Sequence, residues 1–180
     1  VSSHDAAAAS HHVTDGVIEA VDDERVPMSE HTDRPAAAIE ILTIGDELLR
    51  GDLVDSNSAW LATQLLTLGL PVTRIASVGD EADDIANALG EASERASVVI
   101  TSGGLGPTDD DRTIGALAQA ASVELARDEA ALAHVKARFA RAGLTLTPNN
   151  ESQVWVPAGA AVLLNEQGTA PAVRLAMPNS

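Results

Sequence analysis

A glycine-rich segment that ends in three carboxylates is the part of this sequence whose residue types and spacing best suit chemistry. Residues 101–111 read TSGGLGPTDDD. The glycines that let the backbone adopt positive φ and approach a ligand are Gly103, Gly104 and Gly106. Free N–H groups at the start of a following helix can bind phosphate, which predicts a site for a phosphorylated ligand. The alternative interpretation is a tight strand-to-helix turn capped by Thr108 or Asp109, which a Gly-Gly-x-Gly stretch alone would favour.

The carboxylates Asp109, Asp110 and Asp111 set a second condition on this ligand. The segment lacks the lysine of a Walker-type phosphate loop, and phosphate repels bare carboxylates. We therefore expect a divalent cation such as Mg²⁺ to join them, since hard oxygen ligands suit it, and Arg112 adds a further donor. In the alternative, the aspartates only interact with the positive end of a helix dipole, and each interaction stabilises the helix by under about 1 kcal/mol. We expect one or two of them to do this and the others to face the ligand.

Two more acidic segments are expected beside the glycine-rich one. Ligands of open α/β sheets bind outside the carboxyl ends of the strands. Gly45-Asp46-Glu47 and Gly79-Asp80-Glu81 each follow a predicted strand and so reach the same edge. The cation is therefore assigned to Asp110 and Asp111, with Asp46, Glu47 or Asp80 as further ligands.

The apolar pattern predicts the elements that position these residues. Buried parallel strands are expected at 39–44, 71–78 and 98–101, and short strands at 154–156 and 162–164. The expected helices are one capped by Ser56 or Asn57 with the stripe Trp60, Leu61, Leu65 and Leu68, one capped by Asp80 that reaches Arg95, one around 114–121, and one around 132–139. The order predicts a doubly wound α/β fold with right-handed crossovers.

Composition bounds the remaining possibilities. The 180 residues are 45% hydrophobic and 2% aromatic, which suits one core of Ala, Leu, Val and Ile. A net charge of −16 repels nucleic acid and anionic membranes, so neither is an expected partner. The chain has no cysteine, no apolar run of about 20 residues and no signal-like start, which predicts a cytoplasmic location.

Residues 1–37 have no sustained apolar period, and this pattern predicts a disordered or weakly ordered extension. Four of the five histidines fall there, and we interpret them as part of a solvated tail. The following domain is expected to span residues 38–180.

Five ordered motifs resemble one known family. They are Thr43-Ile44-Gly45-Asp46-Glu47-Leu48-Leu49-Arg50-Gly51 with Asp55-Ser56-Asn57, Val78-Gly79-Asp80, residues 103–113, Thr147-Pro148-Asn149-Asn150-Glu151, and Asn165 with Gly168-Thr169-Ala170-Pro171. Over residues 39–171 the chain resembles the N-terminal domain of CinA, the competence/damage-inducible protein. The resemblance implies a three-layer α/β/α fold of the molybdopterin-binding superfamily, with a mostly parallel sheet.

The resemblance also implies an activity, metal-dependent hydrolysis of ADP-ribose to AMP and ribose 5-phosphate. Asp80 and Asp111 match aspartates that matter in the MogA-like branch, and Asp110 belongs to the pair in CinA proteins. The candidates are thus Asp80, Asp110 and Asp111 for catalysis, Asn57, Gly103, Gly104, Gly106, Thr108 and Arg112 for ligand binding, and Asp46, Glu47, Asp110 and Asp111 for metal. A non-catalytic module for a pterin or nucleotide is the alternative, and homo-oligomers occur in the superfamily.

Two departures from the family pattern bear on activity. CinA domains continue after Pro171 into a strand and a Pro-Gly-x-Pro-x-Glu loop, whereas this chain ends at Ser180. The nicotinamide-nucleotide amidase domain of full-length CinA is also missing. We therefore expect a C-terminally shortened domain, and a third hypothesis is an inert remnant.

Overall fold

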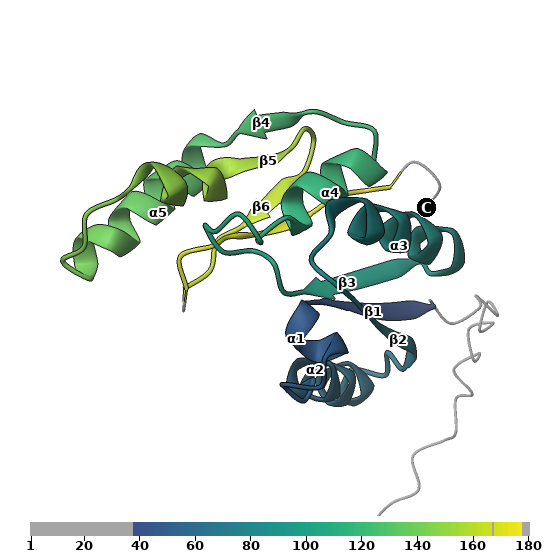
Figure 1. The fold of residues 1–180 in the computed structure, drawn as a ribbon. Helices are drawn as coiled ribbons and strands as arrows, with labels where there is room; N and C mark the ends of the chain where they lie inside the picture. Colours follow the sequence, from purple (N-terminus) through teal and green to yellow (C-terminus); the bar gives the residue numbers. More distant parts are fainter. Residues whose placement is uncertain (1–37, 167, 178–180) are drawn as a thin grey trace, which may run out of the picture. The chain divides into compact units, whose positions relative to one another are not determined.

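The computed structural model describes residues 38–166 and 168–177 (Figure 1). The described residues all belong to one compact unit, Arg34–Ser180. The predicted N-terminal extension, residues 1–37, lies outside the described residues.

A three-stranded parallel sheet forms the centre of the described unit. Its strands are β1 (Ile39–Ile44), β2 (Val72–Val78) and β3 (Val98–Ser102), in the order β2-β1-β3. All six residues of β1 are buried, because β1 is the middle strand and is covered on both faces. The three strands lie where the apolar runs predict them.

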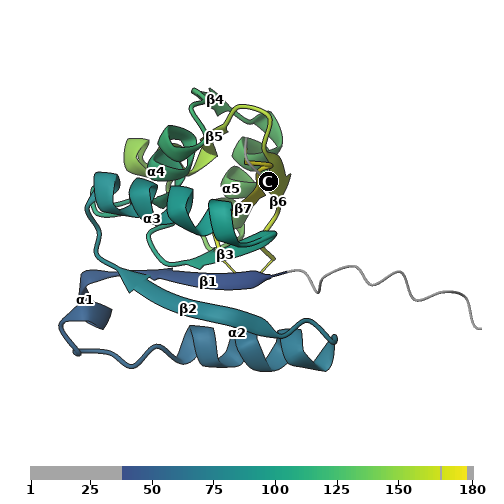
Figure 2. The same cartoon turned by 90° about the vertical axis from the view of Figure 1, so that its right-hand side faces the viewer.

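Helices cover both faces of this sheet. Figure 2 shows α3 (Ala82–Arg95) and α4 (Thr113–Ala120) on one face, with α1 (Asp46–Leu49) and α2 (Ser56–Thr67) on the other. Leu42 and Ile44 of β1 pack with Ile85 and Leu89 of α3 in the main core. The three-layer α/β/α fold with a parallel sheet is therefore confirmed.

A second region follows α4 and contains short elements. It consists of β4 (Leu125–Arg127), α5 (Glu129–Arg141), the 3₁₀ helix η1 (Pro148–Val154), β5 (Trp155–Pro157), β6 (Ala161–Leu163) and β7 (Ala172–Arg174). β4 pairs with β5 and β6 with β7, both antiparallel. Leu132 and Val135 of α5 pack on Val154 in a separate small core. The predicted strands at 154–156 and 162–164 are each displaced by one residue, and β4 and β7 were not predicted.

Two predicted helix caps are wrong, and so is the cap at Thr108 or Asp109 that belonged to the alternative interpretation of the glycine-rich loop. The cap of α2 is Asp55, whose carboxylate accepts the Ser58 N–H at 2.9 Å, because Ser56 already lies in the first turn. α3 begins after Glu81, so Asp80 stands outside the helix. Arg112, with no side-chain capping bond, occupies the cap of α4.

The predicted apolar stripe of α2 is only partly buried. Leu61 and Leu65 are half-buried, whereas the exposed fractions of Trp60 and Leu68 are 62% and 71%. The four-residue α1, directly after β1, was not predicted. Among the described residues, no helix has the length and apolar character needed to cross a membrane.

Candidate functional site

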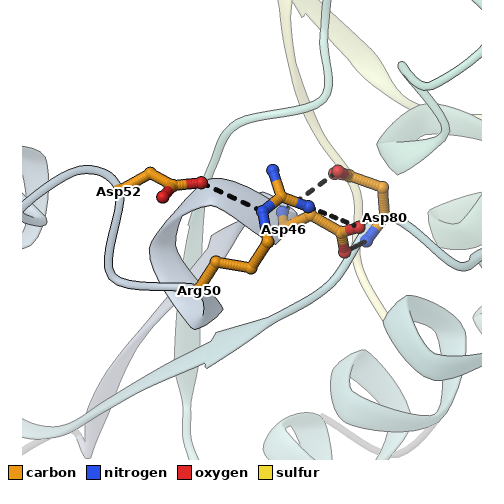
Figure 3. A network of polar contacts seen from close by, with 4 residues as sticks. All are labelled: Asp46, Arg50, Asp52 and Asp80. Carbon is orange, nitrogen blue, oxygen red and sulfur yellow. Dashed lines mark hydrogen bonds and ion pairs between the residues drawn. The ribbon is translucent and has the colours of Figure 1, made fainter.

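The loops that follow β1 and β2 are joined at the carboxyl edge of the sheet. The Asp46 N–H donates to Asp80 Oδ2 at 3.1 Å, and the Asp80 N–H donates to Asp46 Oδ1 at 3.2 Å (Figure 3). Parallel pairing of β1 with β2 brings the two strand ends together, as the sequence predicts. Each carboxylate therefore holds the main chain of the neighbouring loop.

Arg50 is a basic residue of this edge that was not among the predicted site residues. Its Nε lies 3.0 Å from Asp52 Oδ2, and its Nη1 lies 3.3 Å from Asp46 Oδ2 (Figure 3). The hydrogen bond to Asp52, assisted by the charges of Asp52, Asp46 and Glu47, raises the pKa of Arg50. The spacing Asp46 to Arg50 is a helical i,i+4 pair, a signal that is hidden when the segment is interpreted as a loop.

A hollow of about 340 Å³ opens at this edge, and we call it the charged hollow. It is lined by Asp46, Glu47, Arg50, Asp80, Glu81, Asp110 and Arg112. Arg112 donates from Nη1 to Glu81 Oε2 at 3.1 Å and from Nε to the Asp109 carbonyl at 3.0 Å. Two guanidinium groups thus line a hollow that is otherwise acidic, and each already has a carboxylate partner.

A smaller hollow of about 170 Å³, which we call the mixed hollow, lies between residues of α1, the start of α2 and the ends of β1 and β3. It is lined by Thr43, Ile44, Glu47, Leu48, Leu53, Val54, Asp55, Ser56, Asn57, Ser102 and Gly103. Asn57 donates from Nδ2 to Ser102 Oγ at 3.1 Å, which ties α2 to the end of β3. Glu47 lines both hollows, so the two are neighbours.

The glycine-rich loop packs closely on its own chain. Gly103 has a φ of +109°, and a Cβ there would overlap the carbonyl oxygen of Ile44. Gly104 has a φ of +62°, and its Cβ would overlap Thr113 Oγ1, which donates to the Gly103 carbonyl at 2.9 Å. These two glycines are therefore required by contacts with β1 and α4, whatever ligand the loop meets.

The carboxylates after the loop have different surroundings. Asp111 Oδ2 accepts the Thr108 N–H at 2.9 Å and the Thr108 hydroxyl at 2.6 Å. Partial burial opposes the charge of Asp111, but the hydrogen bonds from Thr108 and the Gly106 main chain outweigh it and lower its pKa. Asp110 instead lines the charged hollow, whereas Asp111 lines neither hollow. Asp111 thus closes a turn within its own loop.

The predicted metal ligands do not form a ready metal site. Asp46, Glu47 and Asp110 line the same hollow, but nowhere in residues 38–166 and 168–177 do three or more acidic or histidine side chains converge closely enough to hold an ion. Asp46 is bound to Arg50, and Asp111 is bound to Thr108. The side chains present do not fit a cation by themselves.

Of the predicted ligand-binding residues, Arg112 lines the charged hollow and Asn57 and Gly103 line the mixed one. Gly104, Gly106 and Thr108 line neither. Gln153 was not predicted, because a lone amide on a short 3₁₀ helix gives no periodic signal. It is 9% exposed, and its Nε2 donates to the Leu105 carbonyl at 3.3 Å, which links η1 to the glycine-rich loop.

The family relationship follows from this fold and from comparison with known proteins. The family described as "Probable molybdopterin binding domain" matches residues 40–178. The crystal structure of the protein CinA, of unknown function, from Thermoplasma acidophilum superposes with a TM-score of 0.74 at 34% identity, over 80% of this chain and 84% of that one. The chain therefore belongs to the molybdopterin-binding domain family, in its CinA-like branch.

Curated relatives agree with this placement. A CinA-like protein of Anaeromyxobacter dehalogenans is 48% identical over 133 residues, which cover 74% of this chain and 33% of the relative. A CinA-like protein of Cytophaga hutchinsonii is 44% identical over 132 residues, which cover 73% of this chain and 32% of the relative. The chain thus spans about a third of the length of these relatives.

Proposed function

We propose that this chain binds a small phosphorylated ligand with a ring, of the nucleotide or pterin kind, across the two hollows. The phosphate would face Arg50 and Arg112 in the charged hollow, and the ring would enter the mixed hollow. The observation that carries the proposal is the pair of guanidinium groups in one hollow of a chain with a net charge of −16. Membership of the molybdopterin-binding family supports the ligand class.

The arginines change the electrostatic argument made from sequence. Their planar guanidinium groups bind phosphate oxygens in pairs, so a phosphate can be neutralised without a metal ion. Arg50 and Arg112 now pair with exposed carboxylates, and such surface pairs add little to stability. A phosphate can therefore compete with these partners for the guanidinium groups, against the repulsion of the five carboxylates that line the same hollow.

The mixed hollow suits a planar ring. Leu48, Leu53 and Val54 supply apolar surface, while Asn57 and Ser102 supply groups that donate or accept hydrogen bonds. Ligand sites commonly combine apolar walls with a few polar groups of this kind.

Hydrolysis of ADP-ribose is the second candidate function, and the position of Asp110 favours it. Asp110 lines the charged hollow, and the residues described here give its carboxylate no hydrogen-bond partner. It is therefore available to accept a proton from water. Water oxygen would bond to one phosphorus, the bridging oxygen would leave with the other phosphate, and the products would be AMP and ribose 5-phosphate. A divalent cation would need the phosphate oxygens of the ligand to complete its coordination.

Binding is tested first, by calorimetry with AMP, ADP-ribose and a pterin phosphate, with and without Mg²⁺. Arg50→Gln and Arg112→Gln should each weaken affinity by about tenfold to a hundredfold, the value of a charge-assisted hydrogen bond. Arg141→Gln, at the end of α5 and outside both hollows, is the matched control. Equal affinity of all four proteins, or no binding of any probe, would overturn the proposal.

Turnover is tested separately, by chromatographic detection of AMP released from ADP-ribose. The wild-type chain should release AMP and Asp110→Asn should not, although both bind the ligand. Binding without release in the wild type would leave a non-catalytic module and exclude the second candidate.

A further inference from the structure

Glu47 is the residue that the charged hollow and the mixed hollow share. The carboxylates that line the two hollows and already accept a hydrogen bond or pair with an arginine are Asp46, Asp55, Asp80 and Glu81. Within residues 38–166 and 168–177, the carboxylates of Glu47 and Asp110 do neither. Glu47 is also half-buried, and a partly buried charge without a hydrogen bond is unfavourable. A ligand group that donates to Glu47 would therefore gain a bond that the protein itself does not make.

The main chain holds this carboxylate at the junction of the hollows. The Glu47 carbonyl accepts the N–H groups of Asp52 and Leu53, at 2.9 and 3.3 Å. A Cβ on Gly45 would lie 2.7 Å from each oxygen of the Glu47 carboxylate, so the side chain folds back over the bare main chain of this glycine. Arg50 pairs with other carboxylates. The position of Glu47 is thus set by the backbone, and both of its oxygens remain available.

A carboxylate at this junction restricts which ligand groups can lie there. An ionised carboxylate only accepts hydrogen bonds, and it repels phosphate. In a nucleotide the group between phosphate and ring is a ribose, whose neighbouring 2′ and 3′ hydroxyls are neutral donors. The two oxygens of one carboxylate can accept both hydroxyls, and an acidic residue binds the ribose hydroxyl in dinucleotide-binding folds.

We propose that Glu47 binds the sugar hydroxyls of the ligand and so selects a ribonucleotide over its deoxy analogues. The inference rests on the proposed function, which places the phosphate beside Arg50 and Arg112 and the ring in the mixed hollow. A deoxy ligand would cover Glu47 and leave part of its hydrogen-bonding capacity unused, which lowers affinity. Glu47 then acts on the ligand directly, and not through a metal ion.

The test is calorimetry of the whole 180-residue chain with AMP, 2′-deoxy-AMP and 3′-deoxy-AMP, in EDTA so that no divalent cation contributes. The wild type should bind AMP about tenfold more tightly than either deoxy analogue, the value of one hydrogen bond to a charged group. In Glu47→Gln this preference should fall to about threefold or less, because a neutral amide is a weaker acceptor. The measured quantity is the ratio of affinities, since removal of a negative charge should tighten the binding of all three phosphates alike.

Asp110→Asn is the matched control. Asp110 is also a carboxylate without a partner among the described residues, but it lines the charged hollow alone. Its substitution should change the affinity for the three nucleotides by the same factor and keep the preference of about tenfold for AMP. Circular dichroism and thermal melts check that both variants are folded.

The outcomes distinguish this inference from the proposed function. Equal binding of AMP and both deoxy analogues by the wild type, or binding of a pterin phosphate alone, would overturn the inference and leave the proposed function standing. An unchanged preference in Glu47→Gln would also overturn it, as would a preference that appears only when Mg²⁺ replaces EDTA, since Glu47 would then act through a cation. No binding of any probe would overturn the proposed function, and this inference with it.

Discussion

Asp46 and Asp80 each accept a hydrogen bond from the main-chain N–H of the other, at 3.1 and 3.2 Å. The bonds join loops that lie 34 residues apart in the chain, at the edge where the charged hollow opens. Both carboxylates are thus structural groups of the site as well as candidates for its chemistry. Variants of either residue must therefore be chosen to distinguish its contribution to stability from its contribution to chemistry.

A comparison of Asp80→Asn with Asp80→Ala distinguishes the hydrogen bond of Asp80 from its charge. The asparagine keeps an oxygen that can accept the Asp46 N–H but has no charge, whereas the alanine leaves the N–H without this partner. We expect Asp80→Ala to lose about 1 kcal/mol of unfolding free energy and about 2–4 °C in Tm, and Asp80→Asn to melt close to wild type.

The same variants report on catalysis if the chain hydrolyses ADP-ribose. Asp80→Asn should then lower AMP release by about a hundredfold or more, the usual contribution of a group that transfers protons. Asp84→Asn, on the exposed side of α3 and outside both hollows, should remain at the wild-type rate. Full activity in Asp80→Asn would restrict Asp80 to its structural role.

The location of Asp46 and Asp80 at one edge of the sheet could be predicted from sequence because it depends only on apolar runs that end at glycines. Parallel strands place their carboxyl ends at the same edge of a sheet. The order β2-β1-β3, which makes β1 and β2 neighbours, could not be predicted, because crossover rules fix handedness and not which strands pair. The part played by Arg50 could not be predicted, because α1 has four residues and too short a pattern to be recognised. β4 and β7 escaped prediction because each contains a single large apolar residue, whereas β5 and β6, which also have three residues, contain two.

The direction of individual side chains also could not be predicted from the sequence. The run of aspartates after the glycine-rich loop gives no sequence signal that distinguishes Asp110 from Asp111. The hydrogen bond from the Thr108 hydroxyl, at 2.6 Å, distinguishes the two aspartates, because it turns Asp111 back into the loop. Such local hydrogen bonds compete with any ligand for the same carboxylate.

Glycine-to-alanine substitutions should have opposite effects in the loop and in α4. Gly103→Ala should destabilise the fold by about 1–3 kcal/mol, because its positive φ is unfavourable for alanine and its Cβ would overlap the Ile44 carbonyl. Gly115, in α4, has open space around it, so Gly115→Ala should stabilise by about 0.5–1 kcal/mol. Urea denaturation measures both, and a tolerated Gly103→Ala would contradict the close packing of the loop on β1.

The cap of α2 predicts a dependence of stability on pH. Partial burial opposes the charge of Asp55, but its hydrogen bonds from Ser58 outweigh this and lower its pKa below the ordinary 3.8. The ionised cap therefore stabilises the fold fully above about pH 4, and the contribution disappears as the pH falls through the lowered pKa. Asp55→Ala should cost about 1 kcal/mol at pH 7.

The comparison with Asp55→Asn isolates the charge, because asparagine can cap the helix without titrating between pH 7 and pH 3. The difference in unfolding free energy between wild type and Asp55→Asn should shrink as the pH falls from 7 to 3. A constant difference, measured by urea denaturation at several pH values, would show that the charge of Asp55 does not contribute.

Gln153 links η1 to the glycine-rich loop, and its removal should loosen the loop more than the fold. The side chain is buried, its Nε2 donates to the Leu105 carbonyl, and its Oε1 has no partner among the described residues. Gln153→Leu removes both the bond and the unpaired oxygen, so the two effects on stability should nearly cancel. Hydrogen exchange at residues 105–111 should nevertheless become faster, because Leu105 loses its anchor. Gln153→Glu buries a carboxylate at the same place and should cost about 2 kcal/mol or more. Unchanged exchange in Gln153→Leu would mean that packing on β1 and α4 alone holds the loop in place.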